Sequence, residues 1–185
     1  MSRLPQLSLE TLSAEQRRVY DAIASGPRGV VAGPMLAWLN CPKFAERAQA
    51  LGLYCRFGSS LPPRLSELAI LTVAVHWRAA FEWEAHAQIA RQAGLPAEVM
   101  SALQRGETPI FTDPGDAVVY GFIVELLRDR RIDEATWTAA LGQLRLEGVV
   151  DLIGVVGYYS LIAMTLIGFE IPPMSGSGAY MSFEQ

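Results

Sequence analysis

The chain has 185 residues, enough to bury one sizeable core, so we expect a single domain spanning residues 1–185. Its formal net charge is −4 and it has no run of Lys or Arg, which excludes the basic surface of a typical nucleic-acid-binding protein. Hydrophobic residues make up 51% of the chain and charged residues only 18%; this requires either a large core or a covered apolar face, and we favour a homo-oligomer.

The N-terminal segment predicts a helix over residues 9–25, where apolar residues recur at helical spacing. Ser13 and Gln16 are three residues apart and fit a capping box, either inside this helix or at its true start. Gly26 and Pro27 follow, and this pair predicts the end of the helix.

Strand signals are weak along the rest of the chain, and helical periodicity continues between glycines and prolines. We expect a short apolar turn at 35–40 and helices at 42–57, 64–79, 80–93, 96–105, 114–130, 133–146 and 148–168. The predicted fold class is therefore an all-α bundle with its core at 34–172. The tail, residues 173–185, is expected to be flexible or to grip a neighbouring subunit.

One apolar segment is long enough to raise the question of a membrane span. Residues 152–169 contain no charge over eighteen positions, which is the lower limit for a spanning helix. Arg145 lies well upstream, and no Lys or Arg follows the segment to anchor it. We therefore expect no membrane partner, and a helix buried in the bundle or at a subunit interface.

The two cysteines, Cys41 and Cys55, do not form a CxxC pair or any other spacing typical of zinc sites. We interpret both as reduced thiols of a cytoplasmic protein. The first residues also lack the long apolar core of a secretory signal, so we do not expect export.

Histidine is scarce in this chain, and one of its two histidines, His86, follows Glu82 by four residues. Positions four apart on a helix are separated by only about 40° around the axis, so these side chains share one face. Glu67 lies fifteen residues before Glu82. A carboxylate beside an imidazole can transfer a proton, contribute to a metal site or form a plain surface ion pair, and this spacing alone does not choose between them.

The sequence around these residues resembles the carboxymuconolactone decarboxylase family, which includes the alkylhydroperoxidase-D-type proteins. The resemblance runs from about residue 34 to residue 172, and it is carried by the segments 50–71, 81–86, 90–95 and 151–159. It implies an all-helical fold that assembles as trimers or hexamers.

In the peroxidase branch of that family the motif is a Glu, then CxxC, then a His separated from the second Cys by three residues. When the sequences are aligned on His86, the Glu matches Glu67, whereas the cysteine positions fall on Ala79 and Glu82. Disulfide exchange needs two thiols, so the peroxidase mechanism is excluded unless Cys41 or Cys55 approaches the site. The decarboxylase branch is similar to this chain in placing a Glu four residues before the His.

The resemblance therefore implies a cofactor-free enzyme that decarboxylates a small carboxylated lactone or oxo acid, or performs related acid–base chemistry. His86 would be the proton donor and acceptor, Glu82 would orient or tune it, and Glu67 would be a second acid–base or orienting group. Growing enolate charge needs a nearby cation, and the expected substrate-binding residues are Arg64, Arg78 and Trp83. We expect no metal ion.

Two alternatives remain open at this stage. The first is a hydroperoxide-reducing protein that uses another arrangement of thiols. The second is an oligomeric protein that binds a small molecule without catalysis, in which Glu82 and His86 would point away from the ligand pocket.

Overall fold

The computed structural model describes residues 2–4 and 7–175, and every regular element in this part of the chain is a helix, as predicted. Of the tail expected at 173–185, residues 173–175 are described, and the rest of the tail lies outside the described residues. The elements in chain order are α1 (Ala14–Ala24), α2 (Pro34–Trp38), α3 (Pro42–Leu53), the π-helical turn η1 (Tyr54–Gly58), α4 (Pro63–Trp77), α5 (Ala80–Gln92), α6 (Ala97–Gln104), α7 (Pro114–Asp129) and α8 (Glu134–Gly168).

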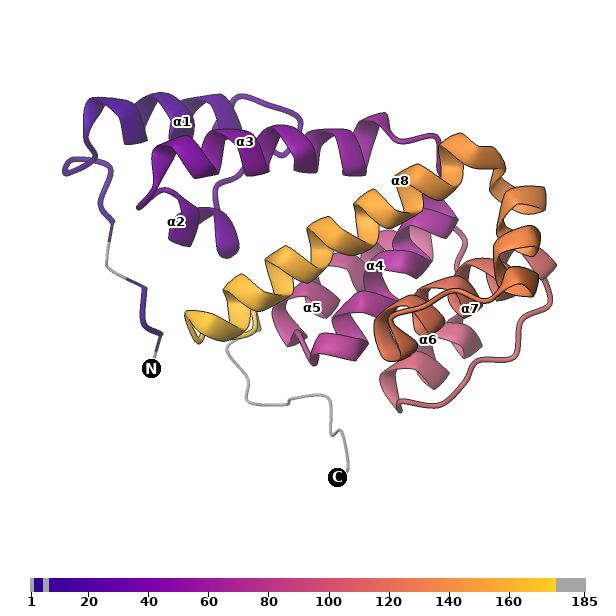
Figure 1. Cartoon of the computed structure of the whole chain (residues 1–185). Coiled ribbons are helices and arrows are strands. Elements are labelled where there is room, and N and C mark those ends of the chain that lie inside the picture. The colour runs from indigo at the N-terminus through magenta and orange to yellow at the C-terminus, as the bar shows by residue number, and fades with distance from the viewer. Residues whose placement is uncertain (1, 5–6, 176–185) are drawn as a thin grey trace.

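The apolar half of α8 crosses the molecule between two groups of helices (Figure 1). The first three helices lie along one side of it, and α4 to α7 lie along the other. Within the second group α4 is central, because it packs against α5, α7 and α8. Its residues from Leu65 to Ala74 are all buried, so this helix is apolar all round except for a few polar positions such as Glu67.

Helix α1 begins where the capping box predicts, at Ala14 rather than at residue 9. The Ser13 hydroxyl accepts a hydrogen bond from the Gln16 backbone N–H at 3.2 Å, and the Gln16 side chain accepts one from the Ser13 N–H at 2.9 Å. These two bonds pair N–H groups that a helix start otherwise leaves without partners, and they fix the first turn.

Helix α8 contains a break at Arg145, whose backbone has φ 60° and ψ 173°. The two expected helices, 133–146 and 148–168, are therefore present with a sharp change of direction between them. Within the described residues, α8 is the one helix long and apolar enough to cross a membrane, but 56% of its most apolar window is buried inside the protein. Core helices of soluble proteins meet the same criterion, and the packing of α8 against α4 and α7 is typical of such a helix.

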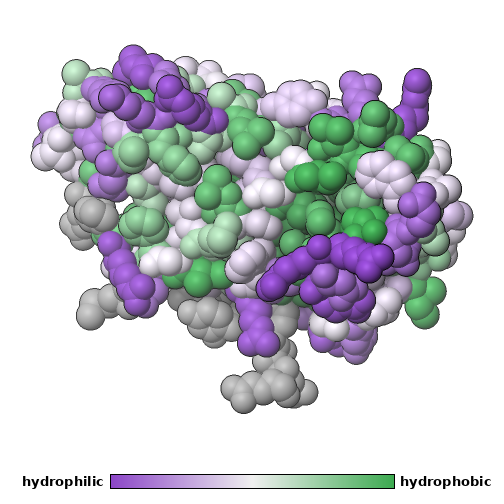
Figure 2. Space-filling view, in the orientation of Figure 1, coloured by the Kyte–Doolittle hydropathy of each residue, from purple (hydrophilic) through white to green (hydrophobic). Residues whose placement is uncertain are grey.

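Several large apolar side chains of α8 face outward. Figure 2 shows apolar side chains gathered over this helix. Those exposed on α8 are Leu146, Val150, Ile153, Met164 and Ile167, and the adjoining end of α3 and η1 add Leu51, Tyr54 and Phe57. We refer to these eight residues as the α8 face.

Gly52 allows α3 to approach the core closely, and we expect Gly52→Ala to destabilise the protein. A Cβ at this position would overlap the hydroxyl of Tyr158 and crowd the guanidinium of Arg28. We expect a loss of about 1–3 kcal/mol in the free energy of unfolding, measured by urea denaturation. The control is Gly142→Ala on α8, where a Cβ would meet nothing. This change should stabilise by up to about 1 kcal/mol, and a similar gain at Gly52 would contradict the packing argument.

Candidate active site

Glu67 and His86 form a buried pair that joins α4 to α5. The Nδ1 atom of His86 lies 2.8 Å from Oε2 of Glu67, and the two residues are only 6% and 5% exposed. The pairing follows from the helical hairpin. Helix α4 ends at Arg78 in the left-handed conformation, φ 54°, and α5 begins two residues later. Residues at similar distances before and after this turn then face one another, as Glu67 and His86 do.

The contact with Glu67 orients the imidazole. When Nδ1 carries the proton and donates to the Glu67 carboxylate, the lone pair of the ring is on Nε2. No group among the described residues hydrogen-bonds to Nε2. The ring of Tyr159 packs edge-on against the imidazole, with centroids 5.1 Å apart and an interplanar angle of 89°. Nε2 is thus free to accept a proton from a bound molecule.

Glu82 lies one turn before His86 on α5 and is 2% exposed. Neither of its carboxyl oxygens has a hydrogen-bond partner among the described residues. Burial raises the pKa of this carboxyl well above its usual value, because the charged form loses its hydration. The expected pairing of Glu82 with His86 is therefore wrong: Glu67 orients the imidazole, and Glu82 is a separate carboxyl whose neutral form is favoured.

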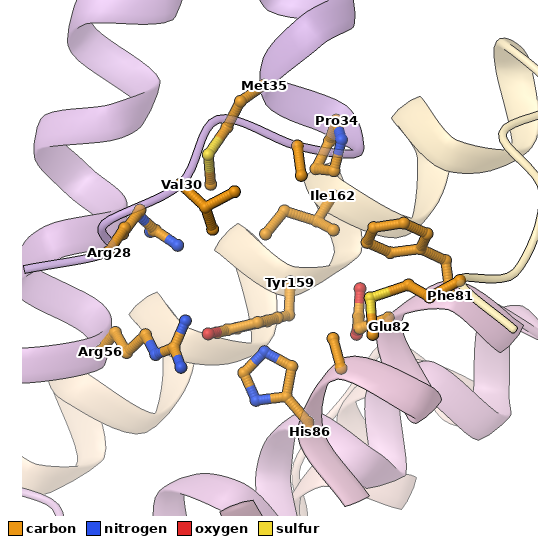
Figure 3. Close-up of a pocket in the computed structure, with 13 residues that line it drawn as sticks. Arg28, Val30, Pro34, Met35, Arg56, Phe81, Glu82, His86, Tyr159 and Ile162 are labelled. Carbon is orange, nitrogen blue, oxygen red and sulfur yellow. The ribbon is translucent and has the colours of Figure 1, made fainter. Parts of the chain in front are cut away.

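A cavity of about 150 Å³ connects these groups. Both His86 and Glu82 line it, so the expectation for a non-catalytic protein, in which they point away from the pocket, does not match this geometry. Figure 3 shows the two side chains on the same side of the cavity, with apolar side chains across from them. The rest of the wall comes from the loop before α2, from α2, η1, α5 and α8, and from the segment after α8. Its residues are Arg28, Val30, Ala32, Pro34, Met35, Arg56, Phe81, Ala85, Tyr159, Ile162 and Met174.

Two arginines and a tyrosine form the other end of the cavity. Figure 3 shows Arg28, Arg56 and the hydroxyl of Tyr159 near one another, away from Glu82. Arg28 donates a hydrogen bond from Nη2 to the Tyr158 hydroxyl at 3.2 Å, whereas its Nε is buried without a partner among the described residues. The Tyr159 hydroxyl is also buried without one, and burial raises its pKa. This end is cationic and rich in hydrogen-bond donors.

The cations expected at the site are located elsewhere. Arg64 forms ion pairs with Asp113 and Asp116 of the α7 N-terminus, each at 2.6 Å, and does not line the cavity. Arg78 caps α4 and borders a different groove. Trp83 is buried, but it does not line the cavity either. None of these three residues lines the cavity that holds His86 and Glu82, so their substrate-binding role stays a prediction.

The Arg64 ion pairs have a structural role, and we expect Arg64→Met to destabilise the protein by about 2 kcal/mol. The change leaves the carboxylate of Asp116, 2% exposed, without its cation. The loss is smaller than for a fully buried pair because the Arg64 side chain is 29% exposed. Arg105→Met, which removes an exposed surface pair with Glu107, should leave stability almost unchanged. Chemical denaturation of both variants tests this, and equal effects would contradict it.

The thiols are separate from the cavity. Cys41 is exposed and Cys55 is buried, and neither lines the cavity. Burial raises the pKa of the Cys55 thiol to about 11, so at neutral pH it is not a thiolate nucleophile. Within the described part of the chain, no group of three or more His, Cys, Asp and Glu residues is placed to hold a metal ion.

Sequence reasoning missed Arg28, Arg56 and Tyr159 as cavity residues. Arg28 lies in a loop rich in glycine and proline, and nothing in its local pattern indicates a ligand contact. Tyr159 lies in the uncharged segment that is part of the resemblance. Its polar hydroxyl within that apolar segment was the one local sign of a cavity residue.

Comparison with known proteins agrees with this fold. Residues 42–115 match the model of the carboxymuconolactone decarboxylase family, which confirms the resemblance; no curated protein matches the chain. An uncharacterised peroxidase-related protein from Silicibacter sp. TM1040 has a TM-score of 0.72 at 16% identity, covering 97% of this chain and 93% of that chain. A protein of unknown function from Agrobacterium tumefaciens, for which a role as the antioxidant defence protein AhpD has been suggested, has a TM-score of 0.64 at 15% identity, covering 74% and 94%. At these identities the two structures share the fold alone.

Proposed function

We propose, on the premise that residues 42–115 are a segment of the carboxymuconolactone decarboxylase family, that this chain is a cofactor-free acid–base enzyme. Its substrate would be a small carboxylated lactone or oxo acid, and the reaction decarboxylation or a related proton transfer. The observation that carries the proposal is the buried Glu67–His86 pair, whose open Nε2 shares a cavity with the carboxyl of Glu82.

The three side chains divide the chemistry between them. When a carboxylate leaves as carbon dioxide, its bonding electrons pass into the adjacent carbonyl system and form an enolate. The neutral Glu82 carboxyl donates a hydrogen bond to the enolate oxygen and stabilises the developing charge. His86 takes up a proton from water at Nε2 and delivers it to the carbon that lost the carboxylate. Glu67 holds the ring in place through its contact with Nδ1.

Direct measurement of carbon dioxide release from a panel of lactone acids and oxo acids tests this function. The wild-type chain should release carbon dioxide from at least one of them, and His86→Gln should not. Saturable binding without release by either protein would contradict catalysis and favour a binding protein.

A hydroperoxide reductase is the second candidate, because one structurally similar protein is described as peroxidase-related. The arrangement of the thiols argues against it, since neither cysteine lines the cavity. Hydroperoxide reduction measured before and after alkylation of Cys41 and Cys55 separates the candidates. We expect no thiol-dependent reduction.

We also propose that the chain is a cytoplasmic homo-oligomer, either a trimer or a hexamer. The α8 face supports this assembly, because it leaves several large apolar side chains in contact with water. Burying that face against another copy removes them from solvent. Sedimentation equilibrium measures the stoichiometry directly.

A further inference from the structure

The cavity contains an unusual share of the polar groups that the fold leaves unpaired. Six buried side-chain atoms of the described residues have no hydrogen-bond partner, and four of them belong to residues that line this cavity. These four are Nε of Arg28, both oxygens of Glu82 and the hydroxyl of Tyr159. Buried polar groups without partners destabilise the folded protein. Because four of the six lie at one cavity, we expect a ligand that pairs with them.

The unpaired groups are separated by type along the cavity. Arg28 and Arg56 are at one end with the Tyr159 hydroxyl, whereas Glu82 is at the other, with His86 between them (Figure 3). A guanidinium can only donate hydrogen bonds, so its partner must be an acceptor. Neither arginine has an acidic ion-pair partner in residues 2–4 and 7–175. Glu82, the acidic residue that lines the cavity, has its neutral form favoured by burial.

The cationic end therefore suits a carboxylate, which arginine binds with two parallel hydrogen bonds. The rest of the cavity suits an apolar body, since its walls include Val30, Pro34, Phe81 and Ile162. The volume of about 150 Å³ limits the size of that body. An apolar cavity of this order accommodates a benzene ring.

We infer that the cavity binds a ring-sized carboxylate in one orientation, with that carboxylate at Arg28, Arg56 and Tyr159 and the ring beside Glu82 and His86. The binding orientation is inferred from the geometry of the cavity alone, whereas its consequence for the reaction rests on the proposed function. Two guanidinium groups stabilise a bound carboxylate and oppose its loss as carbon dioxide. The anchored carboxylate therefore stays on the molecule, and a substrate that loses carbon dioxide carries a second carboxylate on the part of the ring near His86.

Isothermal titration calorimetry with benzoate and its uncharged isostere benzamide tests the inference. Wild-type protein should bind benzoate at least about tenfold more tightly than benzamide, because the amide cannot pair with both cations. Arg56→Met should reduce benzoate affinity by about tenfold or more and leave benzamide affinity unchanged. Arg105→Met, at a surface arginine away from the cavity, should bind benzoate like wild type.

Equal binding of benzoate and benzamide by wild type would overturn the inference, as would undetectable benzoate binding or unchanged benzoate affinity in Arg56→Met. Arg28 also bonds to Tyr158, so Arg28→Met is used only if it folds, and the other measurements decide the matter without it. His86→Gln should keep the affinity for benzoate. Selective benzoate binding with no turnover of any substrate would refute the proposed function but support the carboxylate site. Turnover without a preference for benzoate over benzamide would support the proposed function but refute the carboxylate site.

Discussion

Replacing His86 by Gln is expected to lower the catalysed rate by about 10²–10⁴-fold, because the variant loses the group that takes up and returns the proton. Glutamine has similar length, and its amide N–H can still donate to Glu67, so the melting temperature should change little. Steady-state kinetics on the best substrate of the carbon dioxide screen measure the rate, and circular dichroism measures the melting temperature.

His76→Gln is the matched control, because it removes the other histidine of the chain at an exposed position outside the cavity. This variant should retain the wild-type rate. A His86→Gln variant as active as wild type would contradict the proposed mechanism.

Glu67→Gln should lower kcat more than it raises KM, since the carboxylate acts through the imidazole and has no contact with substrate of its own.

The helices could be predicted closely because their boundaries are local. Ser13 caps α1 and Asp133 caps α8 through their own side chains, and both contacts are encoded within three residues. Prolines at the first positions of α3 and α7 act in the same way, since they suit a helix start and no other helical position. The break inside α8 was expected near residue 147 and lies at Arg145.

The carboxyl that orients His86 could not be predicted from spacing. Glu82 is a neighbour of His86 on the helix surface, but sharing a face does not bring two side chains into contact. Glu67 reaches His86 across the α4–α5 hairpin, and this contact depends on the turn at Arg78 and on the packing of the two helices. The resemblance placed Glu67 in the motif; only the three-dimensional arrangement shows which carboxyl pairs.

The cations that line the cavity were not predicted, for a related reason. Arg64 and Arg78 were chosen as the nearest cations, but the guanidinium of Arg64 reaches α7. Arg28 is far from Glu67 in the sequence, whereas Arg56 precedes it by eleven residues; the two arginines reach the cavity through the loop before α2 and through η1. Contacts between distant segments depend on tertiary packing, for which a single sequence has no local signal.

Glu82→Gln is expected to change how stability depends on pH. Burial raises the pKa of Glu82 in the folded protein, whereas in the unfolded chain water hydrates the carboxylate. The contribution of Glu82 to stability is therefore fully present below the unfolded pKa and is lost as the pH rises through the folded pKa. Between these two values the wild type should lose about 1.4 kcal/mol per pH unit from this residue alone. Glutamine does not ionise. As the pH rises, the free energy of unfolding of the variant should therefore increase relative to wild type by the same amount per pH unit.

Urea denaturation of both proteins from pH 4 to pH 9 measures the difference, and Glu46→Gln supplies a control of opposite sign. Arg18 lowers the pKa of Glu46 through a hydrogen bond and its charge, so the Glu46 contribution is present above the unfolded pKa and is lost as the pH falls. Relative to wild type, Glu46→Gln should thus be less stable near neutral pH and should converge with it in acid. Parallel curves for wild type and Glu82→Gln would mean that Glu82 is already ionised in the folded state. A charged carboxylate could not donate a hydrogen bond to an enolate oxygen, so the same result would remove Glu82 from the proposed chemistry.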